Sequence, residues 1–264
     1  WLLRRWNWYA ARFAVNHCRG VLSVDSSLLR LIQHAMPDKR HKVDVIPNFV
    51  DDDRFHPGRD DALRQQLGFD DGDVVVFYPR NISLQRGYHI LFDLVRRLGS
   101  SHPQIKFLVA GRGIVRGEMA EGIPPNSYEY RLVSALQQAG LTDRVRFAGS
   151  IPHEDMPRHY RASDLVIIPT YFSEGTSLSA LEGMASGKPL IVSNIGGLND
   201  LVIDGYAGSI VPPDASAFAS KIVEALEQPE LVAERARRAL EMIRGAYTRK
   251  HWEDRVDRFL GFSS

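Results

Sequence analysis

Residues 173–189 read Ser-Glu-Gly-Thr-Ser-Leu-Ser-Ala-Leu-Glu-Gly-Met-Ala-Ser-Gly-Lys-Pro, and the apolar run Leu-Val-Ile-Ile-Pro at 165–169 stands shortly before them. A short apolar run of this kind is typical of a strand buried on both faces of a parallel sheet. The small, hydroxyl-rich residues after it predict a tight loop that opens into a helix. The sequence therefore predicts a strand, loop and helix unit, the place where open α/β sheets bind ligands.

Two glutamates mark this unit. Glu174 stands at the loop entrance, and Glu182 lies about two turns inside the expected helix. Gly175 allows a sharp turn and the close approach of a ligand, and the first N–H groups of the helix suit an anion or a hydroxyl. A nucleotide sugar has two separated hydroxyl clusters that can meet both carboxylates. The hydroxyl residues available to cap the helix are Thr176, Ser177 and Ser179.

Strand-like and helical patterns alternate along nearly the whole chain. This alternation predicts a parallel sheet covered by helices on both faces, and right-handed crossovers make it a doubly wound, Rossmann-like α/β fold. The expected strands are 20–24, 43–47, 74–79, 105–110, 145–149, 165–169, 189–193 and 208–211. The expected helices are 1–17, 27–36, 87–99, 128–139, 154–162, 177–186, 215–227, 231–245 and 252–260.

The composition excludes several classes of protein. The chain has 264 residues and a net charge of +1, so nothing points to a nucleic-acid partner. One cysteine cannot form an internal disulfide and fits a reducing, cytoplasmic location. No apolar run has the length of a membrane span. The spacing of His153 and His159 fits no zinc pattern, so we expect no metal site there.

The segment around the two glutamates resembles the signature of the retaining glycosyltransferases of family 4, which have the two-domain GT-B fold. In that family the first glutamate contacts the donor sugar and the second contacts the ribose hydroxyls. The resemblance implies these roles for Glu174 and Glu182. It also implies donor contacts from the loop between them, at Gly175, Thr176, Ser177 and Leu178.

Two arginines follow the buried strand 74–79. Arg80 ends this strand and Arg86 begins the next helix, at the positions where the family usually has Arg and Lys that bind the donor diphosphate. Arginine keeps the charge and can bind two phosphate oxygens at once. Fixed cations stabilise the charge that builds on a leaving diphosphate. Together with Glu174, these two residues are the predicted catalytic residues.

Two further turns resemble donor-binding turns of the family. The first is a Gly-x-Gly turn at Gly111 and Gly113, and the second follows strand 145–149 at Ser150 and Ile151, where backbone groups of the family contact the nucleotide base. The Gly-Gly loop near 193–197 is expected to support the site through its backbone.

The resemblance divides the chain into four parts. Residues 1–45 correspond to the tail of an N-terminal, acceptor-binding domain, and 46–70 to the crossing between domains, where Phe49 stands in place of the usual glycine. Residues 71–246 correspond to the donor-binding domain, and 247–264 to a helix that crosses back. The remainder of the N-terminal domain is then expected upstream of Trp1.

The helix expected over residues 1–17 interleaves Trp6, Trp8, Tyr9 and Phe13 with arginines. This pattern fits either a packed helix with its basic residues outward or an interfacial helix on a membrane surface. We favour the packed helix and retain peripheral association with the cytoplasmic face of a membrane as the other interpretation.

The predicted function is the transfer of a hexose from a UDP- or GDP-sugar to a glycan, lipid-linked or small-molecule acceptor, with no essential cofactor or metal. Two alternatives stay open: another GT-B enzyme, such as a nucleotide-sugar epimerase or a phosphorylase-like enzyme, and a non-catalytic module that binds a nucleotide sugar.

Overall fold

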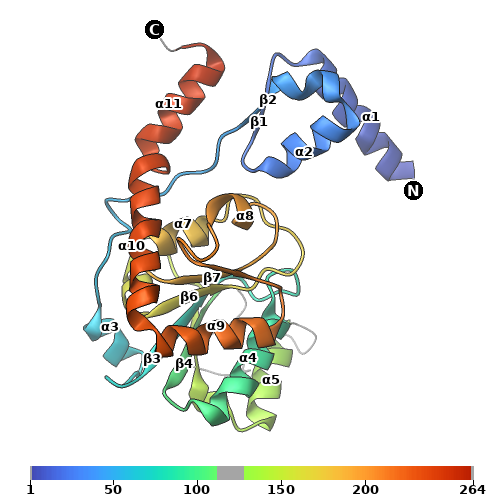
Figure 1. Ribbon diagram of the computed structural model, residues 1–264. Helices are drawn as coiled ribbons and strands as arrows, with labels where there is room; N and C mark the ends of the chain where they lie inside the picture. The colour runs from blue at the N-terminus through green and yellow to red at the C-terminus, as the bar shows by residue number, and fades with distance from the viewer. Residues whose placement is uncertain (1, 112–127, 263–264) are drawn as a thin grey trace.

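The computed structural model describes residues 2–111 and 128–262 (Figure 1). The first part of the chain forms a small unit around two parallel strands, β1 and β2. Its elements are α1 (Leu2–His17), β1 (Val21–Ser23), α2 (Ser26–Ala35), the 3-10 helix η1 (Pro37–Lys42) and β2 (Val43–Val45). We call residues 2–45 the N-terminal unit.

The main sheet has six parallel strands in the described residues, in the order β5-β4-β3-β6-β7-β8. Numbered within this sheet, the order is 3-2-1-4-5-6, that of the dinucleotide-binding Rossmann fold. The order reverses between β3 and β6, so their carboxyl ends border the crevice where such sheets bind ligands. The strands are β3 (Val74–Pro79), β4 (Ile105–Ala110), β5 (Val145–Gly149), β6 (Leu165–Ile168), β7 (Leu190–Ser193) and β8 (Ser209–Val211).

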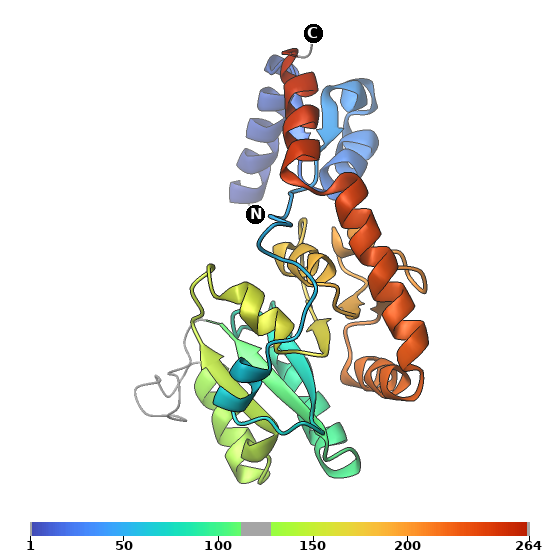
Figure 2. The same cartoon turned by 90° about the vertical axis from the view of Figure 1, so that its left-hand side faces the viewer.

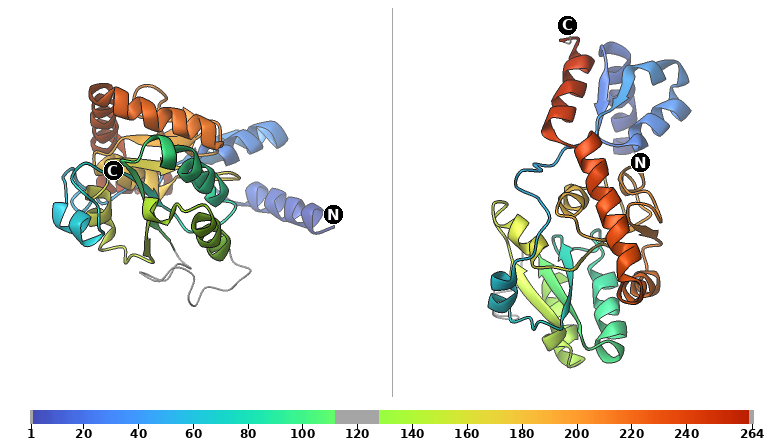
Figure 3. Two further views of the ribbon diagram at one scale, coloured as in Figure 1. Left: turned by 90° about the horizontal axis from the view of Figure 1, so that it is seen from below. Right: turned by 60° about the vertical axis from the view of Figure 1, so that its left-hand side comes forward.

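Helices cover both faces of this sheet, as Figure 3 shows from two further sides. Successive residues of β3 point to opposite faces, so Val75 and Phe77 belong to one apolar core, while Val76 and Tyr78 belong to the other. The first core packs against α6 (Met156–Arg161), α7 (Leu178–Ala185) and α10 (Pro229–Ala246). The second packs against α4 (Tyr88–Ser101), α5 (Tyr128–Gln138) and α9 (Ala215–Glu227).

The doubly wound α/β fold and all eight expected strands are confirmed, with bounds that shift by no more than two residues. The sequence patterns missed α3 (Asp61–Gln66) and α8 (Leu198–Leu201), as well as the 3-10 helices η1 and η2 (Thr142–Arg144). These elements are too short to display a helical period.

The last helix, α11 (Arg249–Leu260), leaves the main sheet and lies beside the N-terminal unit (Figure 2). A Cβ on Gly20 would lie 2.9 Å from the Phe259 ring, so the two segments touch. Phe49, which replaces a glycine usual in the resembling family, packs on Trp252 with ring centroids 5.4 Å apart. The side chain therefore adds a contact between the crossing segment and α11.

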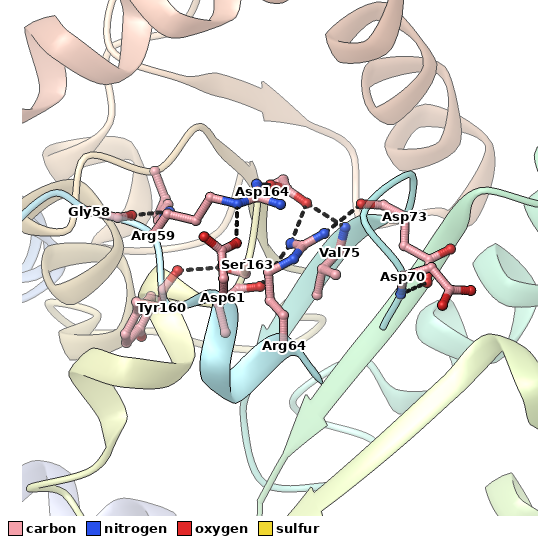
Figure 4. Close-up of polar contacts among 12 residues, drawn as sticks. Gly58, Arg59, Asp61, Arg64, Asp70, Asp73, Val75, Tyr160, Ser163 and Asp164 are labelled. Atoms are coloured by element: carbon pink, nitrogen blue, oxygen red, sulfur yellow. Dashed lines mark hydrogen bonds and ion pairs between the residues drawn. The ribbon is translucent and has the colours of Figure 1, made fainter. Parts of the chain in front are cut away.

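The amino ends of β3 and β6 are joined by a polar cluster around Asp164 (Figure 4). Its carboxylate accepts hydrogen bonds from Arg64 Nη1 at 2.9 Å, Arg59 Nη1 at 3.2 Å and the Val75 N–H at 2.8 Å. Arg64 also donates to the carbonyls of Ala162 and Asp73. Because Arg64 is buried and its guanidinium donates to these three groups, it holds α3 against the amino ends of the strands, opposite the ligand crevice.

Helix α1 differs from the packed helix that we favoured. Tyr9 and Phe13 are 59% and 65% exposed, and of the described side chains from residue 7 to 17 only Val15 is buried. Val15 packs with Ile32 and Met36, while Tyr9 and Phe13 stay exposed. In the described residues, no helix is both long and apolar enough to cross a membrane.

Candidate functional site

A cavity of about 570 Å³ opens at the reversal of strand order. Its walls come from the ends of β3, β4 and β5, from the loop after β6 and from the start of α7. The lining residues are Asn48, Pro79, Arg80, Asn81, Arg86, Ala110, Gly111, Ser150, Ile151, Met156, Glu174, Gly175, Thr176, Ser177, Leu178 and Ser179.

Arg80 is a buried cation in the wall of this cavity. It follows β3 directly, so the sheet aims it at the loop after β6. Its Nη2 lies 2.5 Å from Glu174 Oε2, and its Nη1 donates to Ser177 Oγ at 3.2 Å. Arg80 and Glu174 are only 5% and 8% exposed, so solvent screens this ion pair weakly.

Arg86 reaches the same carboxylate oxygen from the start of α4, at 2.5 Å between Nη1 and Glu174 Oε2. The next residue, Gly87, has φ of 82°, and a Cβ there would lie 1.8 Å from the Pro169 carbonyl oxygen. Only glycine allows α4 to approach the end of β6 this closely. The hydroxyl of buried Tyr78 donates to the Arg86 carbonyl at 2.8 Å, which fixes the backbone between the two cations.

The backbone of Glu174 is held by the loop after β7. Its carbonyl accepts the N–H of Gly197 at 2.9 Å, and a Cβ on Gly196 would lie 2.1 Å from the same oxygen. Thr170 Oγ1 donates to the carboxylate at 3.0 Å. Both the backbone and the carboxylate of Glu174 are therefore held in place. The Gly-Gly loop contacts the loop after β6, which it was expected to support.

The hydroxyls after Gly175 make tertiary contacts, and the expectation that they cap α7 is wrong. Ser177 is the N-cap residue, but its side chain makes no capping hydrogen bond and instead accepts from Arg80. Ser179 Oγ donates to the Pro79 carbonyl at 3.1 Å, and Thr176 Oγ1 donates to the carbonyl of Val24 in the N-terminal unit. These bonds tie the loop to β3 and to β1.

Glu182 lines a second cavity, of about 350 Å³, which shares Asn48 and Leu178 with the first. Its carboxylate accepts the Tyr160 hydroxyl at 2.8 Å and lies 3.2 Å from His153 Nε2. Burial raises the pKa of Glu182, while the bonds from Tyr160 and His153 act in the opposite direction. The two glutamates therefore face neighbouring cavities rather than one undivided crevice.

The other expected donor-binding residues mostly gather at the first cavity. Gly111, Ser150 and Ile151 line it together with residues 174–179, whereas Gly113 and the long loop 112–127 lie outside the described residues. The sequence reading missed Asn48, which lines both cavities, and the polar partners of Glu182. The sequence could have indicated that His153 belongs to the site, because it follows Ile151 by two residues on the same loop.

No group of three or more His, Cys, Asp or Glu side chains with the geometry of a metal site occurs in residues 2–111 and 128–262. Among the residues that the structure describes, the charged groups lining the first cavity are Arg80, Arg86 and Glu174. Two cations against one carboxylate leave a net positive charge there, which suits an anionic ligand.

The model of one protein family, described as "Glycosyl transferases group 1", matches residues 59–242. Among curated relatives, the D-inositol 3-phosphate glycosyltransferase of Geodermatophilus obscurus is 30% identical over 229 residues, which cover 86% of this chain and 48% of that enzyme. The lipopolysaccharide 1,2-N-acetylglucosaminetransferase of Salmonella typhimurium is 29% identical over 223 residues, which cover 82% of this chain and 55% of that enzyme. The chain thus spans about half the length of these two relatives.

The solved structure of Anabaena Alr3699/HepE in complex with UDP-glucose superposes with a TM-score of 0.82 at 25% sequence identity. The match covers 97% of this chain and 67% of that one. It therefore includes the N-terminal unit and α11 as well as the main sheet.

Proposed function

The chain belongs to the group 1 glycosyl transferases, and from this premise we propose that it binds a nucleotide-diphospho-sugar and takes part in transferring the hexose to an acceptor. UDP-sugars are the donors we propose first, because HepE is known in complex with UDP-glucose. The acceptor classes we propose are a glycan, a lipid-linked glycan or a small molecule.

The observation that carries the proposal is the convergence of Arg80 and Arg86 on Glu174 at the reversal of strand order. We assign the donor diphosphate to the two guanidinium groups, which can each bind two phosphate oxygens. The hexose then lies against Glu174 and the hydroxyls at the start of α7. The Glu174 carboxylate pairs with both arginines, so a diphosphate that binds them has to displace it.

Glu182 is proposed to bind the ribose. Its Oε1 faces exposed His153 and its Oε2 is held by buried Tyr160, so the carboxylate is oriented before a ligand arrives. A ribose hydroxyl that donates to Oε1 would replace the contact with His153. The base would lie near Ser150 and Ile151.

The proposed reaction retains the configuration at the anomeric carbon, as in the family 4 enzymes. The bond between C1 and the phosphate oxygen breaks, and the diphosphate leaves with the electron pair. The acceptor oxygen bonds to C1 on the same face, and its proton passes to a phosphate oxygen. Arg80 and Arg86 stabilise the negative charge on the leaving group, so neither glutamate serves as a nucleophile and no metal is assigned.

We propose that residues 1–45 are the tail of an acceptor-binding domain and that 46–70 and 247–264 connect it to the donor domain, residues 71–246. The parallel bridge between Val50 and Thr248 supports this, because it joins the two connections side by side. A two-stranded sheet is also marginal on its own. The exposed Tyr9 and Phe13 on α1 are proposed to meet the rest of that domain or a membrane surface.

The test is binding and turnover of UDP-glucose and other nucleotide sugars by the chain. The chain is expected to bind a nucleotide sugar and to transfer or hydrolyse its hexose. Binding without turnover would favour a non-catalytic module. A product inverted at C1, or a covalent glycosyl adduct on Glu174, would overturn the mechanism.

A further inference from the structure

The N-terminal unit touches the main domain at α8, which directly follows the Gly-Gly loop. The Asp200 carboxylate accepts the backbone N–H of Ser26 at 2.8 Å and the Ser26 hydroxyl at 2.6 Å. Arg30 Nη1 lies 2.5 Å from Ser26 Oγ and 3.9 Å from Asp200 Oδ1. The Ser26 N–H belongs to the first turn of α2, where backbone donors lack intrahelical partners, so an anion is favoured there.

A second contact joins the N-terminal unit to residues 169–177, the loop between β6 and α7, which we call the donor loop. The Thr176 hydroxyl donates to the Val24 carbonyl and accepts the N–H of Asn48 at 3.4 Å. Close packing between the units depends on glycine, because a Cβ on Gly197 would lie 3.0 Å from Asp25 Cβ and 2.5 Å from the Gly175 carbonyl oxygen. The turn from Val24 to Ser26 therefore packs against the loop after β6 and the Gly-Gly loop, which position the residues of the first cavity.

These contacts connect to the predicted catalytic carboxylate through the backbone. Gly197 donates to the Glu174 carbonyl, and Asp200 accepts from Ser26 three residues later. One short segment thus joins the N-terminal unit to Glu174. Movement of the N-terminal unit away from the main domain would pull on the segment that fixes Glu174.

We infer that Asp200 is a positioning residue: through Ser26 it holds the N-terminal unit closed on the donor loop and thereby keeps Glu174 in place for the donor. The inference rests on the proposed donor site. If contact between the N-terminal unit and the donor loop raises the affinity for the donor, bound donor must stabilise that contact by the same free energy. Asp200 itself does not line either cavity beside the glutamates.

The first experiment measures the separation of the two units without any ligand. Spin labels are attached at Gln33→Cys and Arg97→Cys, both exposed, in a Cys18→Ser background, and distances are read by double electron–electron resonance. Asp200→Ala is expected to add longer distances to a narrow distribution, and UDP-glucose to narrow it again. Glu241→Ala, which removes another exposed carboxylate paired with an arginine, serves as the control and should change nothing.

The second experiment measures UDP-glucose affinity by calorimetry. Asp200→Ala is expected to weaken it about threefold to tenfold, as for a charge-assisted hydrogen bond that solvent partly screens. Asp200→Asn keeps an acceptor for the Ser26 N–H and should recover part of the loss. Adding Ser26→Ala to Asp200→Ala should cost little more, because the two residues act as one unit.

The outcomes separate this inference from the proposed function. If the wild-type chain binds no nucleotide sugar, the proposed function fails, while the distance distributions still decide whether Asp200 holds the units together. If the wild type binds UDP-glucose and Asp200→Ala changes neither the distances nor the affinity, Asp200 is not a positioning residue.

Discussion

Arg80 and Glu174 form an ion pair inside the cavity that is proposed to bind a diphosphate, with 2.5 Å between Nη2 and Oε2. Arg86 shares the same oxygen. The residue proposed to bind the sugar is therefore paired with the cations proposed to bind the phosphates. Glu174 acts there as an internal anion with which a diphosphate competes.

Replacing Glu174 with glutamine should free the two arginines for small anions. We expect Glu174→Gln to bind inorganic pyrophosphate about tenfold more tightly, because a charge-assisted contact no longer has to be broken. Turnover of a nucleotide sugar should fall in the same variant. Calorimetry with pyrophosphate checks this, with Glu182→Gln as the control. Equal affinities for all three proteins would show that Glu174 does not compete with the anion.

Removing Arg80 should affect catalysis more than folding. Loss of a buried cation at the leaving group costs about 3 kcal/mol in comparable sites, so Arg80→Ala should lower turnover a hundredfold or more. Arg86→Lys keeps the charge and restores the residue usual in family 4, so it should retain most activity. Steady-state rates of nucleotide-sugar turnover by the wild type and the two variants provide the measurement. Unchanged turnover in Arg80→Ala refutes the role.

Arg64 should matter for stability and not for the site. Arg64→Met removes one donor from the Asp164 carboxylate and removes the guanidinium that donates to the carbonyls of Ala162 and Asp73, which should lower the free energy of unfolding by about 2 to 4 kcal/mol. Arg59→Met removes the neighbouring, half-exposed arginine and should cost less than about 1 kcal/mol. Urea denaturation distinguishes the two. Similar losses of unfolding free energy in the two variants would mean that the buried Arg64 stabilises the fold no more than the half-exposed Arg59.

Lys188 should make stability depend on pH. Burial lowers the pKa of Lys188 to about 8 from its ordinary 10.5. Between these values the unfolded chain binds a proton that the folded chain does not, so this group makes stability rise with pH. The free energy of unfolding of Lys188→Met minus that of the wild type should therefore be larger at pH 7 than at pH 10.5. Denaturation midpoints at pH 7, 9 and 10.5 check this, and a difference independent of pH would contradict the shift.

The sheet and the first cavity could be predicted because their signals are local. Apolar runs of four to six residues gave the strands, and their order along the chain placed Arg80 and Glu174 at carboxyl ends of strands. The convergence of Arg86 on Glu174 could not be predicted, because it depends on the approach of α4 that Gly87 permits. The tertiary bonds of Thr176 and Ser177 outcompeted helix capping, which sequence alone does not reveal.

The position of Glu182 shows the same limit. Its spacing from Glu174 is visible in the sequence, but its separate cavity results from residues far away, such as Phe49 and Trp252. The contact with Ser26 is likewise a product of the fold, since Asp200 lies 174 residues away from it. Pairings of this kind need the three-dimensional arrangement of the elements.

A crystal structure of the chain with a bound UDP-sugar tests the central claim most directly. The account predicts diphosphate oxygens within hydrogen-bond distance of Arg80 and Arg86, the hexose against Glu174 and the ribose at Glu182. A nucleotide sugar bound away from the cavity between β3 and β6, with the Arg80–Glu174 ion pair intact, would contradict it.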